Sequence, residues 1–295
     1  MRSILTAIII LFSVSSFASH IAGGNIEVIY VSPNQYQLKV NLFRSCESGS
    51  SGMPVSIIVG VYRYDTDALV SSYIITTPQI FPYVPFGDTC FVPTGLCVDH
   101  GIFTSDTITI GNYAPGYYLH TQVYARNASI DNLNGPGSTG MSFYTEMADP
   151  AIGPNSSPVL QNYPPGAYFC TGFNRLFTLP ITDPDGDSLS YELVDPLQGA
   201  TAAPTSNGTY PKPYPPVTWA IGYSLANPIG GSVPMSVHAS SGIFNSAPDL
   251  IGKYVFAAKV SEWRAGVKIG ETTIDIQYEA VNCVTCFLVN GAATN

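Results

Sequence analysis

Hydrophobic and polar residues alternate with a period of two along several stretches of this chain. The clearest is residues 35–42, where every second residue is apolar. The same alternation recurs in residues 117–125, 189–193, 254–260 and 274–278. Such alternation predicts strands with one buried face. The unbroken apolar and aromatic run over residues 55–64 predicts a strand that is covered on both faces.

Turn signals separate these stretches, and amphipathic helices are not expected. Gly111–Asn112 and Pro115–Gly116 end predicted strands, and residues 266–270 are expected to join the last two strands as a hairpin. Glycine, proline or β-branched residues interrupt every window of about 11–18 residues that could form a helical stripe. Repeated short strands with frequent turns predict an all-β protein built from β-sandwiches.

A proline-rich stretch near the middle of the chain predicts a domain boundary. Residues 148–158 (ADPAIGPNSSP) contain three prolines and no strand pattern. We therefore expect two β-sandwich domains in tandem, over residues 19–150 and 159–283, with a linker over 151–158. Residues 284–295 are expected to form a frayed tail.

Composition and charge narrow the class of protein. The chain has 295 residues, of which 45% are hydrophobic and 11% charged. An average globular protein has roughly 25% charged residues, so a disordered chain is excluded. The formal net charge of −9 repels polyanions, which makes nucleic acids and anionic lipids poor candidate partners.

The first 18 residues have the pattern of a secretory signal peptide. Arg2 precedes an apolar run over residues 4–14, and small residues lead to a cleavage position after Ala18. The run is too short to span a bilayer, and no later segment is long and apolar enough to do so. We therefore expect a secreted or cell-surface protein.

Export makes the cysteines candidates for disulfide bonds. The six cysteines are Cys46, Cys90, Cys97, Cys170, Cys283 and Cys286. We expect Cys90 to pair with Cys97 across a small loop, and Cys170 to pair with Cys283 or Cys286. Cys46 then lacks an obvious partner. Six cysteines permit 15 pairings, and sequence alone does not choose among them.

A cluster of aspartates carries the strongest chemical signal. Asp183, Asp185 and Asp187 lie within five residues, directly before a predicted strand. Carboxylate oxygens in a tight loop suit calcium, and Glu262 and Asn155 could complete the ligand set. The spacing is not that of an EF-hand. The alternative is an aspartate-rich turn without metal, because proline and glycine at these positions form a turn by themselves.

The sequence contains no convincing catalytic motif, so we expect that the protein is not an enzyme. No Gly-x-Ser-x-Gly motif occurs and the four histidines are scattered. His120 is expected on a solvated strand face. A remote alternative is a copper monooxygenase in which His20 is the first mature residue. Cleavage after Ser19 would then place bulky Phe17 where small residues are preferred.

Several short motifs, taken together, resemble one family over nearly all of the mature chain. The motifs are residues 19–24 (SHIAGG), 42–46 (LFRSC), 126–133 (RNASIDNL), 137–140 (GSTG), 155–158 (NSSP), 183–193 (DPDGDSLSYEL), 217–224 (VTWAIGYS) and 240–266 (SSGIFNSAPDLIGKYVFAAKVSEWRAG). The first five resemble the amino-terminal region of secreted, adhesin-like, gliding-motility-associated surface proteins of gliding bacteria. The last three resemble the cadherin-like, immunoglobulin-type module of these proteins.

The resemblance implies a fold and a role. It implies immunoglobulin-like or cadherin-like β-sandwich domains displayed at the cell surface or secreted. It also supports calcium at Asp183, Asp185 and Asp187, because these positions match the acidic motif of cadherin-like modules.

Two functional hypotheses follow. The first is a non-enzymatic adhesion or structural module, stiffened by calcium, with a surface protein or polysaccharide as its partner. The second is a carbohydrate-binding module in which exposed aromatic rings of Tyr210, Tyr214 and Trp219 stack on sugars. These rings could instead pack against the sandwich, since aromatic residues are often largely buried.

Overall fold

A computed structural model describes residues 20–46, 52–82, 97–164, 166–199 and 208–283. In this part of the chain the regular elements are β-strands and two 3-10 turns, which confirms the all-β fold class. No helix there is long and apolar enough to cross a bilayer. The predicted signal peptide, Cys90, Cys286 and the predicted tail lie outside the described residues.

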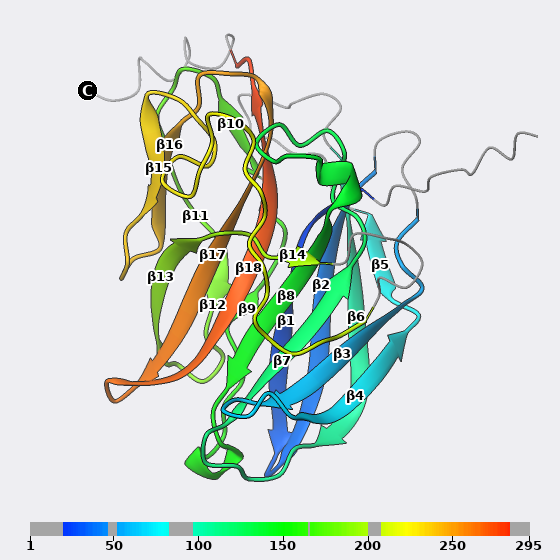
Figure 1. Cartoon of the computed structure of the whole chain (residues 1–295). Coiled ribbons are helices and arrows are strands. Elements are labelled where there is room, and N and C mark those ends of the chain that lie inside the picture. The colour runs from blue at the N-terminus through cyan, green and yellow to red at the C-terminus, as the bar shows by residue number, and fades with distance from the viewer. Residues whose placement is uncertain (1–19, 47–51, 83–96, 165, 200–207, 284–295) are drawn as a thin grey trace, which may run out of the picture.

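In the described residues of its first half the chain forms eight strands and both 3-10 turns (Figure 1). They are β1 (Ile21–Ser32), β2 (Gln35–Ser45), β3 (Ser56–Arg63), β4 (Leu69–Thr76), β5 (Gln79–Pro82), β6 (Val98–Thr109), β7 (Tyr117–Val123), η1 (Pro136–Ser138), β8 (Gly140–Met147) and η2 (Pro150–Ile152).

Ten strands, several of them short, lie in the part of the second half that the structure describes. They are β9 (Val159–Leu160), β10 (Tyr168–Cys170), β11 (Arg175–Thr178), β12 (Ile181–Thr182), β13 (Ser188–Val194), β14 (Gln198–Gly199), β15 (Val233–Val237), β16 (Ile243–Ala247), β17 (Gly252–Arg264) and β18 (Val267–Val281).

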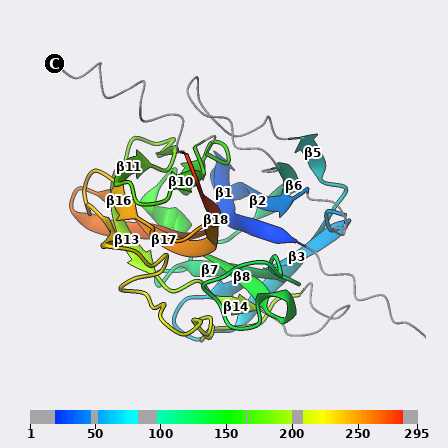
Figure 2. The ribbon, with the colours of Figure 1, turned by 90° about the horizontal axis from the view of Figure 1, so that it is seen from above.

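One large curled sheet runs through both halves, with the order β4-β3-β7-β8-β18-β1-β2-β6-β5. The strands β17, β13 and β10 extend it from β18 into the second half. Seen from above, β18 lies between the strands of the first half and those of the second (Figure 2). Two smaller sheets, β11-β16-β15 and β12-β9, complete the described fold.

Two large hydrophobic cores and two small ones fill the described part of this arrangement. The first lies between strands of the first half and includes Val40, Val61 and Phe103. The second lies under β17 and β18, but it also contains Phe43 and other side chains of the first half. Because one sheet and one core cross the expected boundary, the halves are tied together. The division into two domains stays a prediction.

The strands expected from alternation are found. Residues 35–42 lie in β2, residues 55–64 coincide with β3 to within a residue, and residues 117–123 form β7. The last hairpin is also confirmed, but its turn is short. Arg264 pairs with Val267, so the turn is Ala265–Gly266.

The segment expected to be a linker is packed against its neighbours. Ser156 and Ser157 are buried. The backbone N–H of Val28 donates to Ser157 Oγ at 2.8 Å, and the N–H of Ser157 donates to the Val28 carbonyl at 2.8 Å. Residues 156–157 therefore lie along β1.

Two disulfides are present in the described residues, and they correct one pairing. Cys170 bonds to Cys283, one of the two expected partners, with a Cα–Cα distance of 5.2 Å. Cys97 bonds to Cys46, so its expected pairing with Cys90 is wrong. The physical reason is strand pairing: Arg44 lies opposite Asp99 and Ser45 opposite Val98, which brings Cys46 beside Cys97.

Candidate cation site at the aspartate turn

Residues 183–187 form a tight turn between β12 and β13. Asp183 Oδ1 accepts hydrogen bonds from the backbone N–H groups of Asp185 and Asp187, each at 2.9 Å. Gly186 has φ of +82°, a conformation that glycine adopts without strain. The aspartate-rich turn expected from the sequence is thus formed, with one oxygen of Asp183 holding the backbone.

Arg264, for which the sequence predicted no role, neutralises part of the negative charge of the cluster. The Arg264 guanidinium donates to both carboxylate oxygens of Asp187, at 2.8 and 2.5 Å. It also donates to Asn155 Oδ1 at 2.8 Å and to the Pro154 carbonyl at 2.9 Å. The hydrogen bond to Asp187 raises the pKa of Arg264. Two of the five expected calcium ligands, Asp187 and Asn155, therefore already hold a cationic group.

Asp185 has a structural contact as well. Its Oδ2 accepts the backbone N–H of Ser156 at 2.6 Å. Since Ser157 is bonded to β1, the turn, residues 154–157 and β1 form a continuous chain of contacts. The turn of the second half is in this way fastened to the first half.

Glu262 has the most unusual environment in the cluster. It lies in β17, next to a register shift between Glu262 and Trp263, and it is 0% exposed. Burial and the negative charge of Asp183 raise the pKa of Glu262 to about 9. Its Oε1 accepts a long hydrogen bond of 3.5 Å from Asn155 Nδ2.

The neighbouring strand makes room for this carboxyl group by means of a glycine. Gly270 lies opposite Glu262 in β18. A Cβ atom at Gly270 would come within 2.1 Å of Glu262 Oε2, so a larger residue at this position would displace the carboxyl group.

Two carboxyl oxygens in the cluster are buried without a hydrogen-bond partner: Asp183 Oδ2 and Glu262 Oε2. Unpaired buried carboxylates are costly, so the pair requires either a proton or a cation. Calcium takes roughly six to eight oxygen ligands, which can include waters. Within the described ranges, however, no group of three or more His, Cys, Asp or Glu side chains is arranged to hold a metal. The fit to calcium therefore rests on Asp183 and Glu262 alone.

The aromatic residues considered for sugar stacking are half-buried rather than exposed. The Tyr214 ring stacks on His120 with centroids 4.2 Å apart, and the Tyr210 ring meets the edge of both. The Trp219 ring packs beside the small core that contains Val255, and its Nε1 donates to Asp195 Oδ1 at 2.8 Å. The faces of these rings are largely occupied by protein contacts.

His120 is 0% exposed, so the expectation that it is solvated is wrong. Residues 208–214 cross this face of the sheet and cover it. Thr209 Oγ1 donates to the His120 carbonyl, and Ser142 Oγ lies 3.1 Å from His120 Nε2. Burial lowers the pKa of His120 to about 3.

His20, the centre of the copper alternative, begins the described chain. Its Nδ1 lies 3.2 Å from Asn127 Oδ1, so the ring has an amide neighbour. No contact in the described residues favours a copper site at His20.

No protein-family model, curated protein or solved structure matches this chain. Its function must therefore be argued from its own residues.

Proposed function

We propose that this protein is a non-enzymatic secreted or cell-surface module for adhesion or structural assembly, and that calcium binds at its aspartate turn. The observation that carries the calcium proposal is the buried, unpartnered pair of oxygens on Asp183 and Glu262. Both disulfides are typical of oxidising compartments, which supports an extracellular setting.

The ligand set proposed from the structure is smaller than the one expected from sequence. Asp183 and Glu262 would hold the cation, whereas Asp187 and Asn155 hold Arg264 and Asp185 holds the backbone of Ser156. When bound, calcium would supply charge neutralisation for the carboxylate pair. The role of these residues is to fix the turn against residues 154–157 and thereby stiffen the join between the halves.

Thermal unfolding of residues 19–295 with excess calcium or with chelator tests this proposal. A ligand at 100 times its dissociation constant stabilises the folded state by about 2.7 kcal/mol. We expect a shift of the unfolding midpoint by several degrees, which Asp183→Asn and Glu262→Gln abolish. Calorimetric titration should give one calcium per chain.

The matched control is Asp249→Asn, which removes an exposed carboxylate elsewhere in the second half and should keep the full calcium shift. A wild-type protein with the same midpoint in calcium and in chelator would overturn the calcium proposal. Glu262, whose pKa is raised by burial, would then be neutral rather than paired with a cation.

The adhesive role needs a separate assay. Beads coated with the protein should attach to bacterial cells or to each other more strongly than beads coated with reduced, unfolded protein. If bound calcium stiffens the join between the two halves and the join is needed for adhesion, then adding chelator should lower attachment, and Glu262→Gln should lower it as well. Equal attachment of folded and unfolded coatings would argue against a specific adhesive role.

A further inference from the structure

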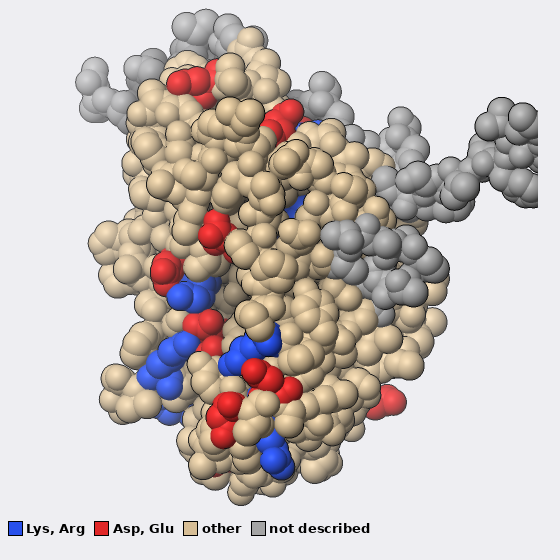
Figure 3. All heavy atoms as spheres, viewed as in Figure 1, with Lys and Arg blue, Asp and Glu red and all other residues tan. Residues whose placement is uncertain are grey.

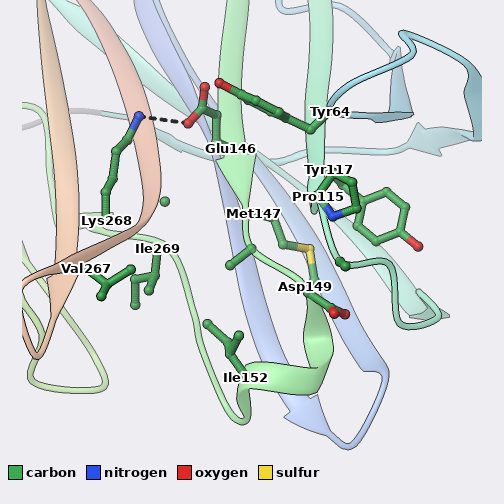
Figure 4. A pocket seen from close by; sticks show the side chains of 13 residues that line it. Tyr64, Pro115, Tyr117, Glu146, Met147, Asp149, Ile152, Val267, Lys268 and Ile269 are labelled. Carbon is green, nitrogen blue, oxygen red and sulfur yellow. Dashed lines mark hydrogen bonds and ion pairs between the residues drawn. The ribbon is translucent and has the colours of Figure 1, made fainter.

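A hollow of about 350 Å³ opens at the end of the molecule where the β17–β18 hairpin approaches η2 (Figure 4). Its walls come from the end of β8, the start of β18, η2 and the loop before β7. The volume is at the small end of the roughly 300–1,000 Å³ range of ligand pockets. It is separate from the aspartate turn, although Gly270 borders both.

Tyr64 supplies an aromatic wall at one end of this hollow. The residue is 39% exposed. The Lys212 ammonium lies 3.9 Å from the ring centroid and donates to the Tyr64 carbonyl at 2.9 Å, so it covers one face of the ring. The Tyr64 hydroxyl points toward Glu146 (Figure 4), and the negative charge of Glu146 raises the pKa of Tyr64.

A fixed group of charges lies beside the ring. Lys268 Nζ lies 2.9 Å from Glu146 Oε2 and 2.6 Å from Glu271 Oε2. Glu146 Oε1 accepts the Tyr144 hydroxyl at 2.7 Å. Each of these side chains is held in position by a hydrogen bond or ion pair with another. Their donors and acceptors are therefore preorganised to bind hydroxyl groups of a ligand.

The opposite end of the hollow is apolar. Val267 and Ile152 are 64% and 46% exposed, and Met147 and Ile269 lie deeper. Asp149 keeps Ile152 in place, since its Oδ1 accepts the backbone N–H of Ala151 and so caps η2. An aromatic ring, exposed aliphatic groups and polar groups therefore surround one small space.

We propose that this hollow binds a neutral sugar unit of an extracellular polysaccharide. A pyranose has C–H faces that pack on aromatic and aliphatic groups and a rim of hydroxyls that reach carboxylates and ammonium groups. The charge of the hollow decides the class of sugar: of its lining residues, Glu146 and Asp149 are negative and Lys268 is positive, so uronic acids and sulfated sugars are disfavoured. Figure 3 shows the setting, with charged side chains of both signs gathered in the lower half of the viewed face.

The inference rests on the proposed extracellular binding role but not on calcium. It also differs from the sequence-based hypothesis, because Tyr210, Tyr214 and Trp219 do not line this hollow. A failure here and a failure of the calcium proposal are distinguishable, since sugar titrations and calcium-dependent unfolding are read separately.

The test is calorimetric titration of the folded protein with three neutral hexasaccharides, from chitin, cellulose and starch, and with hexagalacturonate. We expect at least one neutral probe to bind at concentrations up to about 1 mM, and hexagalacturonate to bind more weakly. Tyr64→Ala should weaken binding about tenfold or more, because it removes the aromatic wall. Ala114→Trp should do the same by filling the hollow from its exposed rim.

Two controls separate loss of binding from loss of folding. Tyr64→Phe keeps the ring and should retain most of the affinity. Phe173→Ala removes a similarly exposed ring, 40% exposed, in the loop after β10, and should leave binding unchanged. The proposal is overturned if no neutral probe binds, if hexagalacturonate binds more tightly, or if Tyr64→Ala and Ala114→Trp bind like the wild type.

Discussion

A buried ion pair links residues far apart in the sequence. Arg126 and Asp275 are 0% and 1% exposed. The Arg126 guanidinium donates to both oxygens of Asp275, at 3.1 and 2.6 Å, and also to the Leu197 carbonyl. Such bidentate pairs have strict geometry. The contact joins the segment after β7 to the centre of β18.

Asp275→Asn should destabilise the protein by about 3–5 kcal/mol, because it leaves the Arg126 charge buried without its counterion. Urea denaturation measures the loss. The double variant Arg126→Met/Asp275→Leu replaces both charges with apolar groups and should lose less stability than Asp275→Asn. A double variant that loses as much stability as Asp275→Asn, or more, would contradict a coupled pair.

The burial of His100 predicts that the folding stability falls in acid. His100 is 7% exposed, and its Nε2 lies 2.9 Å from Asn41 Oδ1. Burial lowers the pKa of His100 from 6.5 to about 4. In the unfolded chain the ring takes up a proton near pH 6.5, whereas in the folded protein it does so only near pH 4. The neutral His100 ring therefore contributes its full stabilisation of the folded state above pH 6.5, and this stabilisation is lost as the pH falls toward 4.

Urea denaturation at pH 7 and at pH 4.5 tests this linkage. His100 should account for about 2–3 kcal/mol of the stability lost between the two pH values. His100→Gln keeps a polar side chain near Asn41 but does not titrate, so its loss over this range should be smaller by that amount. An identical pH dependence in both proteins would contradict the lowered pKa.

Single residues show most clearly where sequence reasoning stops. The turn at Asp183 was predictable, because the proline and glycine that follow it favour a turn. Arg264 was not, since nothing local shows that it folds back onto Asp187. His120 sits at a polar position of an alternating strand, and only the crossing of residues 208–214 buries it. Tyr64 carried no local signal, since its hollow is assembled from distant segments.

Alternation made strands predictable, but it did not show which of their polar residues are buried. The hairpin of β17 and β18 follows from alternation and from Ala265–Gly266, both with positive φ, as a tight hairpin turn requires. The strand β1 was not among those predicted, although Asn25 and Glu27 alternate with Ile26 and Val28, and both polar residues are 0% exposed. Asn41 Nδ2 donates to each of them, at 3.1 and 2.7 Å, so a strand interior that looks polar is satisfied internally.

The disulfide between Cys170 and Cys283 joins β10 to the end of β18 across 113 residues. Replacing both cysteines with alanine should destabilise the protein by about 2–5 kcal/mol, because the unfolded chain regains the freedom of a long loop. Denaturant unfolding measures this loss, and reduction of the wild type, which also breaks the bond between Cys46 and Cys97, should lower the stability at least as much. A double variant as stable as the wild type would show that the bond adds no stability.

At the scale of the whole molecule, β1 and β18 form the join between the two halves of the sheet. Gly23 pairs with Ile276, and a Cβ atom on Gly23 would lie 2.3 Å from the Asp275 carbonyl oxygen. Side chains larger than hydrogen would force the strands apart. The fold thus depends on a glycine at this crossing.

Gly23→Ala should therefore lower the free energy of unfolding by about 1–3 kcal/mol. Hydrogen exchange should speed up on both sides of the join, in β2 as well as in β17. Gly111→Ala is the matched control, since a Cβ atom there meets nothing within 4 Å. Faster exchange in one half alone would mean that the halves are energetically independent.

The antiparallel pairing of β1 with β18 has a mechanical consequence. The start of β1 and the end of β18 lie toward the same pole, and η2 lies at the opposite pole (Figure 1). A tether attached at residue 20 or residue 283 would therefore pull on the pole away from the hollow at Tyr64. Tension between those two points would load the pairs Gly23–Ile276 and Gly24–Asp275, which lie toward the same pole as the two attachment points.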